Sequence, residues 1–88
     1  MTQSTYNGWT NYATWRVNLE LIDSIDPRDI MADGMDVADL ADYFREYTED
    51  VLSCTGEGLA LDYARAFISC VDWREIARHK LAEYELAA

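Results

Sequence analysis

The sequence predicts an all-α fold: a compact single-domain bundle of four main helices and one short helix, preceded by an irregular N-terminal arm. Apolar residues recur three and four positions apart, and cap or breaker residues separate these stretches. No stretch shows the period-two alternation of a strand, apart from a short extended piece before Trp9. Residues 1–88 form one domain, because so short a chain has too little interior for two cores.

The N-terminal arm and the first helix come first in the chain. The first ten residues are polar and aromatic, and Gly8 interrupts them, so we expect an ordered but irregular arm. Thr10 or Asn11 caps a helix that runs to about Ser24. The positions expected to be buried on this helix are Tyr12, Trp15, Val17, Leu19, Leu21 and Ile22.

A short second helix follows. Asp26 accepts hydrogen bonds from free backbone N–H groups, and Pro27 suits the first helical position, so this pair indicates a helix start. Gly34 stops the helix after about two turns.

The third helix has the clearest pattern and is capped by Asp36. At about 100° per residue, its apolar arc of about 140° contains Val37, Leu40, Ala41, Phe44, Tyr47, Thr48, Val51 and Leu52. An opposite arc of about 100° contains Asp39, Asp42, Glu46, Glu49 and Asp50. One face of this helix is therefore expected in the core, and the other forms an acidic stripe.

Two more helices complete the fold. The turn Cys54-Thr55-Gly56-Glu57-Gly58 ends the third helix, and the fourth runs from about Leu59 to Cys70. Its expected buried side is Ala60, Ala64, Phe67, Ile68 and Val71. Asp72 caps the last helix, from Trp73 to about Leu86, with Glu75 completing a start like a capping box. Its apolar stripe is Trp73, Ile76, Ala77, Leu81 and Tyr84.

The cysteines and the N-terminus bear on the compartment. Cys54 and Cys70 fall at opposite ends of two helices expected to be antiparallel, which is too far apart for a disulfide. We therefore expect two free, mostly buried thiols in a reducing compartment. The chain shows neither a signal peptide nor a membrane span, so the cytosol is the expected location.

Acidic residues recur every three or four positions from Glu20 to Asp50. Eleven acids against two arginines give this stretch a formal charge of −9, which is most of the −10 of the whole chain. Such a surface disfavours direct contact with nucleic acid or with a membrane and favours a partner with a Lys/Arg-rich groove. The candidate partner-binding residues are Asp26, Asp29, Asp33, Asp36, Asp39, Asp42, Glu46, Glu49 and Asp50.

The acidic residues and His79 also allow three other interpretations: a solvated helix face, a calcium site and a catalytic site. A solvated helix face also needs polar residues, but exposed helices usually mix charge signs, whereas this one places like charges three and four positions apart. The region of Asp29, Asp33 and Gly34 lacks the alternating oxygen ligands of a calcium loop. His79 has no nucleophile that spacing places near it, and we expect it at the surface. The sequence thus predicts a non-enzymatic protein without cofactor or metal.

The aromatic N-terminus supports an alternative. Its aromatic residues favour core contacts of the arm and first helix, but such density also suits an interaction hot spot. A helical interaction or assembly module that binds through Tyr6 and Trp9 is the second hypothesis. A homodimer is compatible with either hypothesis, because a small helical domain can bury surplus aromatic residues in one.

Two motifs resemble a known family. Residues 7–15 resemble the NGWxNYxTW opening of small proteins from phages and other mobile elements, and residues 71–77 resemble their VxWxEIA segment. Family members usually carry Glu in place of Ala13 and often Trp in place of Glu20. The resemblance implies no catalysis and one aromatic core for Trp9, Trp15 and Trp73. It also implies a small acidic phage protein similar to anti-CRISPR and anti-restriction DNA mimics, which inhibit a host defence system in the host cytosol.

Overall fold

The structure is a computed structural model that describes residues 6–30 and 35–87. Over these residues the chain is all-α, as expected. Its elements are α1 (Tyr12–Val17), the π-helical turn η1 (Asn18–Ile22), α2 (Pro27–Ile30), α3 (Val37–Thr55), α4 (Gly58–Ile68) and α5 (Trp73–Ala87). Each helix starts within one residue of its predicted start. Gly34, the expected stop of the second helix, and the candidate binding residue Asp33 lie outside the described residues.

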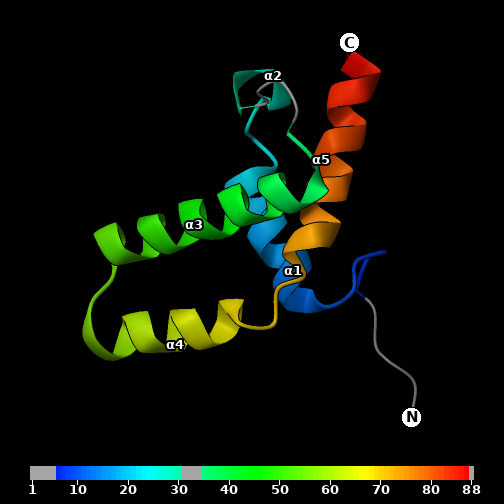
Figure 1. Ribbon diagram of the computed structural model, residues 1–88. Coiled ribbons are helices and arrows are strands. Elements are labelled where there is room, and N and C mark those ends of the chain that lie inside the picture. The colour runs from blue at the N-terminus through cyan, green and yellow to red at the C-terminus, as the bar shows by residue number, and fades with distance from the viewer. Residues whose placement is uncertain (1–5, 31–34, 88) are drawn as a thin grey trace.

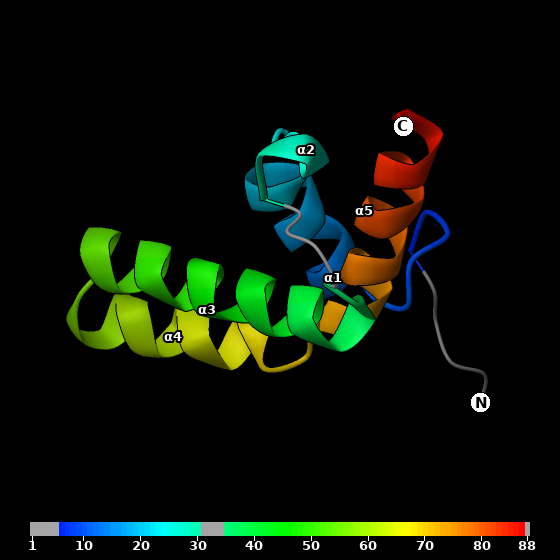
Figure 2. The same cartoon turned by 45° about the horizontal axis from the view of Figure 1, so that its top comes forward.

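The helices form a body and a projecting hairpin. α3 and α4 lie side by side and antiparallel, and together they extend away from α1 and α5 (Figures 1 and 2). The N-terminal part of α3 packs against α5, while α2 also packs against α5. The hairpin helps to give the molecule its flat shape of 42 × 37 × 20 Å.

The core lies where η1, α3 and α5 meet. Ile22, Leu40, Phe44 and Ile76 are completely buried there. Around them lie the other buried apolar residues Ala13, Val17, Ala41, Ile68, Val71 and Ala77. The predicted apolar arc of α3 is confirmed, since its members are buried or half-buried.

The first helix buries only part of the expected face. Val17 and Ile22 are buried, as expected, but Tyr12 and Leu19 are 43% and 50% exposed. The π turn explains the difference: the Asp23 N–H donates to the Asn18 carbonyl over 2.7 Å, five residues back. Such a turn takes an extra residue, so Ile22, rather than Leu21, follows Val17 into the core.

The fourth helix also departs from its predicted face. Ala60 and Phe67 are exposed, whereas Leu61, Ala64 and Ile68 are half-buried or buried. The reason is that α4 packs on α3 along one side, while its outer side meets only α1, through the contact of Phe67 with Tyr12.

The N-terminal arm contains a tight turn. The Tyr6 N–H donates to the Trp9 carbonyl and the Trp9 N–H to the Tyr6 carbonyl, both over 2.8 Å. Asn7 and Gly8 both have positive φ, at 49° and 86°, which Asn-Gly pairs tolerate best. The structure therefore has a closed turn, with a single bridge between Tyr6 and Trp9, where a short extended piece was expected.

The cysteines are free, as expected, but the prediction that they are buried is wrong. Cys54 and Cys70 are both exposed. Cys54 lies in the last turn of α3, at the outer end of the hairpin, and Cys70 lies in the link between α4 and α5.

Polar side chains join α1 to the start of α5. Asn11 caps α1, accepting from the Thr14 N–H at 2.9 Å, and its amide donates to the Cys70 carbonyl at 2.8 Å. Asp72 caps α5 by accepting from the Glu75 N–H at 3.0 Å. In a complete capping box the Glu75 carboxylate would accept from the Asp72 N–H. Here it accepts instead from the Thr10 N–H at 2.9 Å, so it joins the N-terminal arm to α5.

Lys80 is the one charged side chain buried among the described residues, with 3% of its surface exposed. Its Nζ donates to the Ile25 carbonyl at 2.9 Å and pairs with Glu83 at 3.0 Å. This ammonium therefore holds the turn before α2 against α5.

Candidate partner-binding surface

The capping box of α3 sets the register of its acidic face. The Asp36 carboxylate accepts from the Asp39 N–H at 2.9 Å, and the Asp39 carboxylate accepts from the Asp36 N–H at 3.4 Å. Both N–H groups lack helical partners otherwise. From this start, the apolar residues of α3 face α5 and α4, so the acids must face solvent.

The structure brings the predicted acids of α3 to one exposed face. All five of them are exposed: Asp39, Asp42, Glu46, Glu49 and Asp50. They differ in their partners. Asp42 forms an ion pair with Arg45 at 3.5 Å, and Asp39 is occupied by the capping box.

Glu46, Glu49 and Asp50 form what we call the acidic patch. Within the described part of the chain, none of these three carboxylates lies within 4 Å of a cationic group. They stand at i, i+3 and i+4, so their Cβ atoms are about 5–6 Å apart. The acidic patch is thus the part of the predicted stripe that is exposed and free of ion pairs.

The earlier acids do not continue this patch. Asp26 is bound by Arg28 through two guanidinium contacts of 2.9 and 3.2 Å and through the Arg28 N–H at 2.9 Å. These hydrogen bonds hold the pKa of Asp26 below its ordinary value. Asp29 is exposed on α2, which packs on α5. Asp36 serves as a cap, and Asp33 is outside the described residues.

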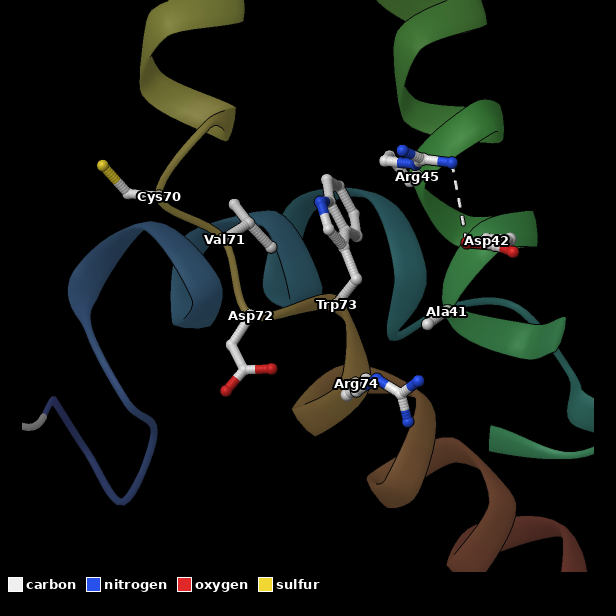
Figure 3. Close-up of a pocket in the computed structure, with 8 residues that line it drawn as sticks. All are labelled: Ala41, Asp42, Arg45, Cys70, Val71, Asp72, Trp73 and Arg74. Atoms are coloured by element: carbon white, nitrogen blue, oxygen red, sulfur yellow. Dashed lines mark ion pairs between the residues drawn. The ribbon is translucent and has the colours of Figure 1, made fainter. Parts of the chain in front are cut away.

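A cleft beside the acidic face was missed by the sequence analysis. It holds about 450 Å³ between α3 and the link from α4 to α5 (Figure 3). Its lining residues are Ala41, Asp42, Arg45, Cys70, Val71, Asp72, Trp73 and Arg74. Trp73 stands in the middle, with Arg45 and Arg74 near it (Figure 3).

A second hollow of about 290 Å³ adjoins this cleft, sharing Arg45, Val71 and Trp73 and adding Glu49 and Arg65. Arginines therefore border the acidic patch on the side that faces α4 and α5. The sequence signal was Arg45, the single cation of the third helix. A basic groove of a partner that runs along these acids must therefore end at the arginines or present an acidic group to them.

The candidate metal-binding and catalytic side chains are not gathered into one site in the described part of the chain. Within residues 6–30 and 35–87, no three His, Cys, Asp or Glu side chains are placed to hold a metal ion together. His79 is exposed, as expected, and stacks on Trp9 with ring centroids 4.0 Å apart.

The three tryptophans do not share one aromatic core. Trp9 stacks on His79, Trp15 contacts Tyr6 and Tyr12, and Trp73 lines the cleft. No ring contact in the described residues joins two tryptophans, so the single aromatic core implied by the resemblance is wrong. The reason is that α1 and the start of α5 are joined by hydrogen bonds of Asn11 and Thr14 instead.

Comparisons with protein-family models, with curated proteins and with solved structures give no match to this chain. Among the described helices, none combines the length and the apolar character needed to cross a membrane.

Proposed function

We propose that this protein is a non-enzymatic inhibitor from a phage or mobile element that acts as an acidic DNA mimic. It occupies a basic nucleic-acid-binding surface of a host defence protein, of the anti-CRISPR or anti-restriction kind. The single observation that carries the proposal is the acidic patch, three adjacent carboxylates that are exposed and have no cationic partner among the described residues.

The charge spacing of α3 supports mimicry. Asp39 to Asp50 span about 17 Å of helix axis and carry five carboxylates, or about one negative charge per 3–4 Å. One strand of duplex DNA carries about one charge per 3.4 Å of axis. A groove of Lys and Arg that follows one DNA strand therefore meets a similar linear charge density on this helix.

The acidic face also has a cost for folding. Like charges at i and i+4 destabilise a helix by about 0.2–0.5 kcal/mol per pair. Glu46 and Asp50 form such a pair, as does Asp42 with Glu46. A face retained for solubility alone would gain from mixed signs, so this arrangement favours a binding role.

Charge reversal tests the proposal. We expect Glu46→Lys/Asp50→Lys to abolish retention of nucleic-acid-binding proteins from a bacterial lysate at low salt, because the reversed charges repel a basic groove. The matched control is Asp23→Lys/Glu85→Lys, which changes the net charge equally at exposed sites outside α3. The wild-type complex should elute with rising salt and be displaced by duplex DNA. Unchanged retention by the folded α3 variant would refute the proposal.

A second candidate function rests on exposed aromatic side chains. Tyr6 and Tyr12 are 39% and 43% exposed and contact each other and Trp15. A helical interaction module using this arm would hold its partner at high salt and lose it on Tyr6→Ala or Trp9→Ala. A complex formed through the acidic patch should instead dissociate at high salt and keep its partner after either substitution.

A further inference from the structure

The outer side of α4 is an exposed apolar stripe. Leu59 is 65% exposed, Tyr63 69% and Phe67 39%. Two exposed alanines complete the stripe, Ala60 and Ala66. At about 100° per residue these five positions share an arc of about 120°. We call them the α4 stripe.

Most of the stripe faces away from the rest of the molecule, and only Phe67 meets another helix, through Tyr12 of α1. The opposite side of α4, formed by Leu61, Ala64 and Ile68, is the side that is half-buried or buried against the fold. Figures 1 and 2 show α4 as the outer member of the hairpin, with α3 on its inner side. The stripe is therefore available to another molecule.

We propose that the α4 stripe binds the α4 stripe of a second copy, with the two helices antiparallel about a two-fold axis at Tyr63. The stripe is symmetric in sequence about this residue. Leu59 and Phe67 lie four positions to either side, and Ala60 and Ala66 lie three positions to either side. A two-fold interface needs such self-complementarity, because each residue must fit its mirror position on the partner.

The antiparallel register pairs large residues with large ones. Tyr63 meets Tyr63 of the second copy at the axis, and Leu59 meets Phe67 of the second copy at each end. Ala60 meets Ala66 of the second copy, and these small side chains leave room for the two helices to approach. In a parallel pair, each side chain of the stripe would instead face the same residue of the second copy.

Charge also favours a second copy at this helix. Although the chain carries −10, α4 contains one acid and one base, Asp62 and Arg65. Neither belongs to the α4 stripe, and Arg65 faces α3, where its guanidinium donates to the Ser53 hydroxyl at 3.3 Å. This helix thus avoids the repulsion that contact between acidic faces would cause.

The available area suits a weak dimer. Tyr12 contacts Phe67 at 6.2 Å between ring centroids and extends the stripe onto α1. With the usual areas of such side chains, the exposed parts amount to roughly 500 Å² per copy. Two copies then bury about 1,000 Å², the lower end of specific interfaces. We therefore expect a weak dimer whose population depends on concentration.

Sedimentation equilibrium tests the dimer. We expect the apparent mass to rise from monomer to dimer with concentration, and more readily at high salt, because salt screens the repulsion between acidic copies. Tyr63→Lys places two ammonium groups at the axis and should raise the dissociation constant at least about tenfold. The matched control is Leu86→Lys, which changes an 88% exposed residue of α5. A folded protein that stays monomeric throughout, or a Tyr63→Lys dimer of unchanged affinity, would overturn the proposal.

Cysteine cross-linking tests the register. In a Cys54→Ser/Cys70→Ser background, Tyr63→Cys should form an intermolecular disulfide under mild oxidation, because the axis brings the two positions within bonding reach. Ala66→Cys should not, because its mirror position is residue 60. Cross-linking at both positions, or at neither, contradicts the antiparallel register. Capture of a different protein by the α4 stripe of a monomeric chain would likewise contradict it.

Discussion

Thr14 shows how single polar residues connect distant parts of this chain. It is completely buried, its hydroxyl donates to the Asn11 side chain at 2.7 Å, and it accepts from the Asp72 N–H at 2.8 Å. Its neighbours in the network come from both motif segments. The motifs thus have a structural role that does not depend on their tryptophans.

Thr14→Val should destabilise the fold by about 1–3 kcal/mol, because the half-buried Asp72 N–H loses its acceptor and the Asn11 side chain loses a donor. The measurement is urea unfolding followed by circular dichroism. Thr55→Val is the control, since the Thr55 hydroxyl bonds only its own helix and is exposed; it should change stability by less than about 0.5 kcal/mol. Equal effects of the two variants would argue against this role.

Asp26 provides a pH-dependent test at the same scale. Arg28 lowers the pKa of Asp26, so this carboxylate contributes stability that is present above its unfolded pKa and is lost as pH falls through the lower folded pKa. Arg28→Ala should raise the pKa of Asp26 toward its ordinary value, measured by NMR titration of the side-chain carboxyl. No pKa change would mean that this ion pair does not persist in solution.

At the scale of elements, α3 combines a strong start with an unfavourable face. Its capping box stabilises the first turn, while the acids of its middle and end repel one another. Helix limits could be predicted well from such local signals, because caps and breakers act within a few residues. Burial on α1 and α4 was predicted less well, because the π turn and the missing outer neighbour of α4 are not local features.

Removing charge from the acidic patch should therefore stabilise the protein. Glu46→Gln/Asp50→Asn is expected to raise the free energy of unfolding by a few tenths of a kcal/mol at low salt, and the gain should shrink at high salt. Thermal unfolding at two salt concentrations measures this. Glu20→Gln serves as a contrast, because Glu20 pairs with Arg16 at 2.7 Å and its loss should not stabilise. A destabilised double variant would show that the patch has favourable contacts within the fold.

At the scale of the whole molecule, different parts carry different surfaces. The core lies at the α5 end of the hairpin. The acidic patch lies on the second half of α3, and the α4 stripe lies on the outer side of the hairpin. The two proposed surfaces differ in chemistry, so salt should weaken one association and strengthen the other.

The sequence by itself determined the all-α fold, the caps and the exposure of the acids on α3. These follow from helical periodicity and from hydrogen bonds between residues three or four positions apart. The sequence left open which acids remain without a cation, and the structure shows that Arg28 pairs with Asp26 and Arg45 with Asp42. Only the tertiary structure decided that Phe67 and both cysteines are exposed, because burial depends on which elements lie opposite, and in the described part of the chain the outer side of α4 meets only α1, at Phe67.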